Sequence, residues 1–205
     1  MSTRSLLAAA ALGGTLVAPR QLSAQTSDSV PETRGHRSSW EFLVPGGAVV
    51  PTGAQRAALG RANLTAVQLS RVVGPALAVT ATVGWARSRD VASADAPKVD
   101  VFTYDLGAEA RAPRVAVGRG LTLAPFAGVG AGARSYDYRS LDLDATHVVA
   151  AYGAVGGELG LRRLRLRLEA RDYLTGFRPL RGGGTTTARN DVVVMAGLRY
   201  VRRGG

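Results

Sequence analysis

The clearest alternation in the chain reads Phe102-Thr103-Tyr104-Asp105-Leu106-Gly107-Ala108-Glu109-Ala110-Arg111-Ala112. Every even position is apolar, and most odd positions carry polar or charged side chains. A second copy, from Leu164 to Arg171, alternates leucine or alanine with arginine or glutamate. Side chains of a β-strand point to opposite faces in turn, so a period of two over this length indicates a strand with two unlike faces.

The same pattern recurs eight times between Trp40 and Arg203, with a break after each copy. The expected strands are Trp40–Val50, Ala62–Arg71, Ala76–Arg87, Val99–Ala112, Gly120–Arg134, His147–Gly160, Arg163–Asp172 and Asp191–Arg202. Each is near the roughly 9–11 residues that a tilted membrane strand needs. The sequence therefore predicts an all-β fold, an eight-stranded antiparallel up-and-down transmembrane β-barrel.

The connections between these strands alternate in length. Short ones follow the second, fourth and sixth strands, at Val72–Pro75, Pro113–Arg119 and Leu161-Arg162. The others are longer, up to Tyr173–Asn190, and the first contains a possible helical turn in Ala54–Ala62. Short turns at one rim and long loops at the other are typical of outer-membrane barrels. We expect the long loops on the outside of the cell.

A two-residue turn at Leu161-Arg162 would set the register of the last short hairpin. Glu158 would then lie opposite Arg165, and Gly156 opposite Arg167. This register brings the polar faces of the two strands together.

Three features favour a polar interior and an apolar exterior. The polar face of the fifth strand carries small residues, which suit a crowded lumen. Aromatic residues on the apolar face gather near the strand ends, as at membrane interfaces. They are Trp40, Phe42 and Tyr200 near one rim and Trp85, Phe102 and Tyr104 near the other. The apolar face between them carries no charge. A soluble exported β-protein, with the same alternation reversed in space, is the alternative.

The last strand contains Met195-Ala196-Gly197-Leu198-Arg199-Tyr200. This segment looks like the terminal strand signal that barrel-assembly machinery reads. Together with the strand count and loop alternation, it makes residues 40–203 resemble the eight-stranded outer-membrane β-barrels of the OmpA/OmpX kind. The chain departs from that pattern by continuing to Val201-Arg-Arg-Gly-Gly205, where such signals usually end on an aromatic residue.

The N-terminus has the order of a secretory signal peptide. Arg4 precedes an apolar run from Leu6 to Val17, and Ala24 supplies a small residue for cleavage. We expect a signal peptide at 1–24, a flexible periplasmic leader at 25–39 and the barrel at 40–203. These features predict export to the cell outer membrane.

Composition narrows the function classes. The 205-residue chain has no cysteine, which excludes disulfides and thiolate metal sites. Its net charge of +11 could indicate nucleic acid or an anionic membrane surface, and export argues against nucleic acid.

Charged residues on the expected lumen face form one candidate site. They are Glu41, Asp105, Glu109, Arg111, Glu158, Arg165, Arg167, Glu169 and Arg199. Unpaired charges in a narrow lumen are costly, so we expect a structural ion-pair network. A gate for a narrow ion pathway and a ligand-binding lumen remain open as alternatives.

Catalysis would need a nucleophile or an acid–base residue at the rim. His147, near Asp142, Asp144 or Asp172, could imitate a catalytic pair of a lipid-modifying barrel, but an ordinary interfacial histidine fits better. No catalytic residue, metal site or cofactor is therefore predicted.

These observations predict a non-enzymatic integral outer-membrane barrel with a structural or surface-interaction role and a filled polar lumen. A narrow pore or small-ligand binder is the alternative. The expected partners are outer-membrane lipids and, during biogenesis, the barrel-assembly machinery. We expect a monomer that binds no nucleic acid.

Overall fold

The structure, a computed structural model, describes residues 39–118, 120–139, 141–176 and 189–200. The expected signal peptide and nearly all of the expected leader lie outside the described residues, as do the last three residues of the expected barrel. The strands are β1 (Ser39–Leu43), β2 (Gly46–Pro51), β3 (Ala62–Val72), β4 (Leu77–Arg89), β5 (Lys98–Arg111), β6 (Val115–Gly118), β7 (Leu121–Tyr138), β8 (Thr146–Leu161), β9 (Leu164–Thr175) and β10 (Arg189–Tyr200).

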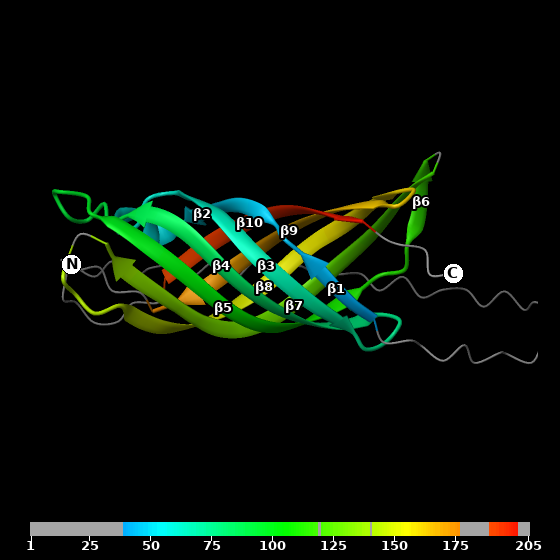
Figure 1. Ribbon diagram of the computed structural model, residues 1–205, viewed down its shortest axis with the longest axis horizontal. Coiled ribbons are helices and arrows are strands. Elements are labelled where there is room, and N and C mark those ends of the chain that lie inside the picture. Colours follow the sequence, from blue (N-terminus) through cyan, green and yellow to red (C-terminus); the bar gives the residue numbers. More distant parts are fainter. Residues whose placement is uncertain (1–38, 119, 140, 177–188, 201–205) are drawn as a thin grey trace, which may run out of the picture. The chain divides into compact units, whose positions relative to one another are not determined.

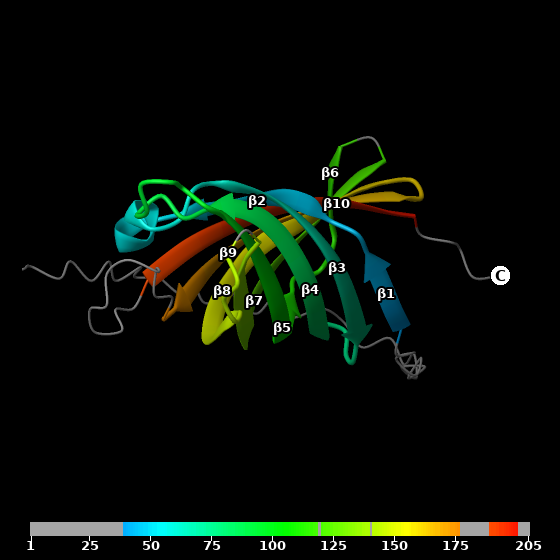
Figure 2. The ribbon, with the colours of Figure 1, turned by 60° about the vertical axis from the view of Figure 1, so that its left-hand side comes forward.

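The strands close into a barrel through an unbroken series of antiparallel pairs. β3, β4, β5, β7, β8, β9 and β10 pair in that order, and β2 joins β10 back to β3. Figures 1 and 2 show the tilted strands side by side in this order. The predicted fold class, a closed eight-stranded up-and-down barrel, is confirmed, with β1 and β2 together forming the first strand.

That first strand is interrupted where the sequence predicts a continuous one. β1 and β2 both pair with β3, and Pro45 lies in the gap between them. Proline has no N–H to donate to a ladder, which favours a break at this position. The Pro45 carbonyl oxygen still accepts a bond from the Ala66 N–H at 2.9 Å, so the chain stays attached to β3.

The connection after β5 was predicted as a short turn and is instead a hairpin. β6 pairs with the first residues of β7, from Leu121 to Leu123. Figure 1 shows β6 extending beyond the rim of the barrel. Val115 lies opposite Leu123, which favours this pairing, and Gly120 takes the positive φ of 74° in the turn.

The register predicted for the hairpin of β8 and β9 is wrong by two residues. Leu161 pairs with Leu164, which leaves Arg162 and Arg163 as the turn, with φ of 54° at Arg162. Glu158 is consequently opposite Arg167. Two leucines then pair across the strands while both arginines lie in the turn. A shift of two preserves the faces, so the polar sets still meet.

Burial alternates along the strands with the polar side inward. Outward apolar side chains are strongly exposed, among them Leu106 (67%) and Val129 (68%). Inward charged side chains such as Arg171 and Glu169 are buried. The interior is therefore polar along much of its length and the exterior apolar, the reverse of a soluble protein.

The long-loop end of the interior contains a cluster of buried apolar residues. The helical turn expected in the first long loop is the 3₁₀ helix η1 (Gly53–Ala57). Just after it, Ala58 and Leu59 join a buried cluster with inward residues that include Val99 and Tyr136. The first long loop thus packs into the barrel end instead of leaving it open.

Small residues on β5 and β7 make room for one large ring. Gly107 lies opposite Gly130, and Gly130 lies opposite Tyr152 of β8. A Cβ at either glycine would meet the Tyr152 side chain, and one at Gly130 would also lie 2.5 Å from the Leu106 carbonyl oxygen. The Tyr152 ring can therefore occupy this position only because Gly107 and Gly130 have no side chains.

Gly130→Ala is expected to lower the free energy of unfolding by about 1–3 kcal/mol, because the added methyl group overpacks the lumen. Urea unfolding of the refolded barrel measures the change. Gly153→Ala is the matched control in β8, where a new Cβ would meet no atom within 4 Å, and it should leave stability unchanged. Equal stability of the two variants would contradict this account of the Tyr152 packing.

Candidate functional site

The candidate site is the set of charged side chains that five strands place inside the barrel. β9 contributes Arg165, Arg167, Glu169 and Arg171, because every second residue of a strand points to the same face. β5 contributes Asp105, Glu109 and Arg111 in the same way, and β1, β8 and β10 contribute the others. Among the described residues, five carboxylates and five guanidinium groups form one connected network.

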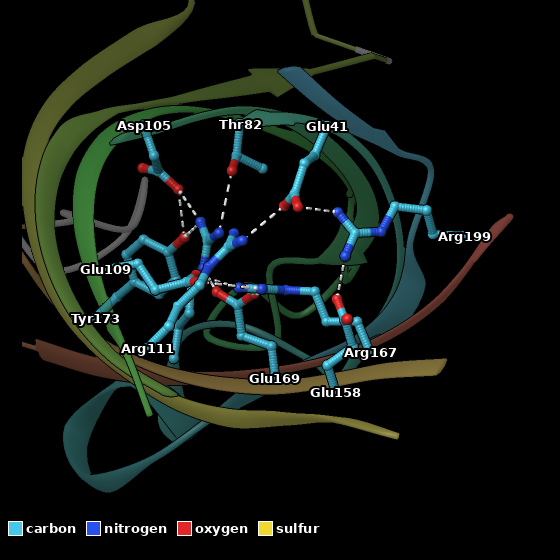
Figure 3. Close-up of polar contacts among 11 residues, drawn as sticks. Glu41, Thr82, Asp105, Glu109, Arg111, Glu158, Arg167, Glu169, Tyr173 and Arg199 are labelled. Carbon is cyan, nitrogen blue, oxygen red and sulfur yellow. Dashed lines mark hydrogen bonds and ion pairs between the residues drawn. The ribbon is translucent and has the colours of Figure 1, made fainter. Parts of the chain in front are cut away.

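Glu41 connects the network at the short-turn end. Its two carboxylate oxygens accept from Arg111 Nη1 at 2.8 Å and Arg199 Nη1 at 2.6 Å. Arg199 also binds Glu158, as Figure 3 shows. The side-chain contacts of Glu41 thereby connect β1 to β5 and β10, and through Arg199 to β8. The ladder of β1 connects it to β3.

Glu158 was predicted to pair with Arg165, and the structure gives it other main partners. Arg165 Nε lies 3.8 Å from Glu158 Oε1, beyond hydrogen-bond distance. The shorter contacts of Glu158 come from Arg199 and, at 3.3 Å, from Arg114. Arg165 Nη1 instead donates to Thr122 Oγ1 at 3.2 Å. The register shift accounts for this, because it places Arg165 beside Gly160.

Three carboxylates and two arginines form the buried centre of the network. Arg167 reaches Glu109 with two nitrogens and Glu169 Oε2 with a further contact of 2.8 Å. Arg171 Nε donates to Glu169 Oε1 at 2.6 Å, and its Nη1 reaches Asp105 Oδ2 at 2.9 Å. Figure 3 shows the contacts of Arg167 with Glu109 and Glu169. Charges this deeply buried need partners, and here each one has at least one oppositely charged partner.

Aromatic rings cover the guanidinium groups in the lumen. Arg167 lies over Phe126 at 3.8 Å from guanidinium carbon to ring centre, and Arg171 lies over Tyr152 at 4.7 Å. Arginine is weakly hydrated and stacks on aromatic faces, so ring and carboxylate together replace the water it loses.

Sequence reasoning missed the part of the interior nearest the long loops. Arg171 contacts Asp105, Glu169 and Thr82, yet it was not among the predicted site residues. Arg134 of β7 forms a fully buried ion pair with Asp191 of β10. These residues stand near the ends of the predicted strands and continue their alternation, which was the available signal.

Two small cavities adjoin this network in the described part of the chain. Two internal cavities, one beside Glu41 and Gln68 and one beside Asp105 and Met195, hold about 10 Å³ each. That is near the smallest volume that admits one water molecule. A larger hollow of about 910 Å³ lies at the short-turn end and is bordered by Arg111, Glu158 and Arg199.

Five of the six predicted interface aromatics lie on the outer face, Trp40, Phe42, Trp85, Phe102 and Tyr104. Trp40 (65% exposed), Phe42 and Tyr104 project outward, and Trp85 is paired with the partly buried Phe102 across β4 and β5. Tyr200 ends β10. Each tryptophan has an arginine over its ring, Arg71 at Trp40 and Arg87 at Trp85.

His147 has a serine as its neighbour. Its Nδ1 lies 2.6 Å from Ser135 Oγ across β7 and β8. Within the described part of the chain it forms no ion pair with a carboxylate, so Asp142, Asp144 and Asp172 do not complete a catalytic arrangement with it. The described residues also include no group of three side chains suited to bind a metal ion. No described helix is long and apolar enough to cross a membrane.

No protein family and no curated protein matches the sequence. Among solved structures, Neisserial surface protein A is similar at 11% identity and a TM-score of 0.47, over 79% of this chain and 98% of that one. Ail, the attachment invasion locus protein of Yersinia pestis, is similar at 10% identity and a TM-score of 0.43, over 80% of this chain and 96% of that one.

Proposed function

We propose that this chain is a non-enzymatic integral outer-membrane barrel with a structural or surface-interaction role. The observation that carries the proposal is the belt, the outward-facing apolar side chains of β4, β5, β9 and β10. Between Leu77 and Trp85 of β4, and between Phe102 and Ala110 of β5, no outward residue is charged. Exposed apolar surface on this scale is unfavourable in water and favourable against lipid.

Strand length and rim chemistry support the same placement. β3, β4, β5, β9 and β10 are 11 to 14 residues long, enough for a tilted strand to cross the hydrocarbon. The tryptophan–arginine pairs at Trp40 and Trp85 have the chemistry of membrane–water interfaces. Closure of the barrel between β2 and β10 pairs strand edges that lipid could not satisfy, and among the described strands β1 pairs with β3 alone.

The filled lumen favours a structural role over transport. The ion pairs of the network occupy the centre and short-turn end of the interior, and the apolar cluster around Leu59, together with the buried pair of Arg134 and Asp191, occupies the long-loop end. A pore would need a pathway through both. The long loops would then carry any surface interaction, with lipids as the surrounding partner and the barrel-assembly machinery acting during biogenesis on a monomeric chain.

Cell fractionation tests the proposal. The protein should sediment with outer membranes, resist extraction by carbonate, and migrate differently in gels before and after heating. Its folded form should leave the conductance of a planar bilayer unchanged. Recovery in the soluble periplasmic fraction would refute the membrane placement, and stepwise conductance would replace the structural role by the pore alternative.

A further inference from the structure

Three positive side chains stand in a row at the long-loop rim, on the outer face. Arg61 precedes β3, Arg89 ends β4, and Lys98 begins β5. Arg89 and Lys98 are direct partners across the ladder, and the Gly60 N–H donates to the Arg89 carbonyl oxygen at 2.9 Å, which brings Arg61 next to them. Like charges directly opposite each other destabilise a strand pair.

The three positive charges of the row are not neutralised by a described carboxylate. Within the described residues, Arg61, Arg89 and Lys98 form no ion pair, and all three are exposed. The nearby Asp100 is already shared by Arg87 at 3.3 Å and by Arg139. Charge at this position is therefore in excess, and an anion from outside the chain would relieve the repulsion.

A hollow of about 430 Å³ adjoins the row. Besides the three cations, Asn63, Thr65 and Trp85 line it, so it offers hydrogen-bonding groups as well as charge. Arg87 stands over the Trp85 ring at 5.0 Å and borders the same hollow. Several positive groups around one concave site suit the oxygens of a phosphate group.

The hollow lies directly next to the belt. On β4, the outward positions that follow Trp85 toward the short-turn end are Val83, Ala81 and Val79, and all are apolar. A molecule with its phosphate in the hollow could lay a hydrocarbon chain along these residues. Free phosphate would contact only the hollow, whereas a lipid would contact both the hollow and the apolar outward residues of β4.

We propose that Arg61, Arg89 and Lys98 bind the phosphate-bearing headgroup of an anionic membrane lipid, with Trp85 at the boundary between headgroup and hydrocarbon. This site rests on the proposed membrane placement and adds a ligand class to it. Lipids of this kind would be retained at one position on the barrel instead of exchanging freely around it.

The test uses the full-length mature chain, refolded in an uncharged maltoside detergent, with Trp40→Phe as background so that fluorescence reports on Trp85. Dioctanoyl phosphatidic acid is the probe. Binding should change the Trp85 emission and raise the unfolding temperature. Arg89→Gln/Lys98→Gln should weaken binding by about 30-fold, because each cation near a lipid surface contributes roughly fivefold.

Arg56→Gln/Arg162→Gln is the matched control, since it removes two exposed positive charges that also form no ion pair in the described chain. It should bind the probe like the parent protein. Equal loss in both double variants would show that only net charge matters and would overturn the site. Binding of dioctanoyl phosphatidylcholine as tight as that of phosphatidic acid would also overturn it.

Titration with inorganic phosphate and insertion into lipid bilayers distinguish the remaining outcomes. If inorganic phosphate gives the same Trp85 response at the same concentration as the lipid, the ligand is a free anion and the lipid proposal is wrong. If Arg89→Gln/Lys98→Gln enters bilayers normally but keeps its preference for phosphatidic acid, the site fails while the membrane placement stands. Failure of the parent chain to enter bilayers would instead refute the proposed function.

Discussion

Replacement of Arg171 by methionine is expected to lower the free energy of unfolding by about 3–5 kcal/mol, the usual cost of removing one partner from a buried ion pair. Arg171 is 1% exposed, and it contacts Glu169, Asp105 and Thr82. Methionine would keep much of the hydrocarbon volume but leave Asp105 with only the Tyr173 hydroxyl as a partner. Urea titration of the refolded barrel, followed by tryptophan fluorescence, measures the loss.

Two further variants separate charge from packing at this site. Asp105→Asn combined with Arg171→Met should be more stable than Arg171→Met alone, because the double variant leaves no unpaired aspartate. Arg87→Met is the matched control on the outer face, where the arginine is about half exposed and paired with Asp100, and it should cost no more than ~1 kcal/mol. A cost of Arg171→Met as small as that of the control would mean that water screens the lumen.

Leu106→Arg should be the most damaging change on the outer face, lowering the stability of the barrel in a bilayer by about 2–4 kcal/mol. Leu106 is 67% exposed and lies midway along the outward apolar stretch of β5. Its ladder partners are Ala81 and Ala131, so no neighbouring carboxylate could pair with the new charge. The penalty arises from placing a guanidinium in hydrocarbon, and it should be measured by unfolding from lipid vesicles.

Val115→Arg is the control for the lipid-facing position. Val115 is 50% exposed in β6, in the hairpin beyond the barrel rim, where the same change should cost roughly 0–1 kcal/mol because charged residues are tolerated near the interface. If Leu106→Arg were tolerated as well as Val115→Arg, the belt would face water, and the proposed membrane placement would be wrong.

The hairpin of β8 and β9 shows what the alternating sequence pattern predicts and what it does not. The alternating pattern specified that Glu158 and the odd residues of β9 share a face, and this holds for any even shift of register. It could not specify which arginine lies opposite Glu158, because both candidate turns satisfy the pattern. The backbone geometry at Arg162 and the pairing of Leu161 with Leu164 decided between them.

The β6 hairpin shows a different limit of prediction from sequence. The connection Pro113–Arg119 is short, and the sequence predicts a turn there, yet Val115 and Ala116 pair with the start of β7. Such pairing depends on whether the adjacent strand continues past the rim, which is a property of two segments together. The break at Pro45 had a signal in the sequence, because proline removes a ladder donor wherever it stands, but the expected continuous strand Trp40–Val50 did not take it into account.

The sequence by itself determined the strand number, the antiparallel order and the assignment of each side chain to one of two faces, because a strand repeats every two residues. Only the tertiary structure decided which charges meet. Arg171 reaches Asp105 from β9 to β5, and Arg111 reaches Glu41 from β5 to β1, across a lumen whose geometry follows from closure of the whole sheet. The row of Arg61, Arg89 and Lys98 likewise exists only because three strand ends are adjacent at one rim. The two-residue repeat within each strand does not predict this adjacency.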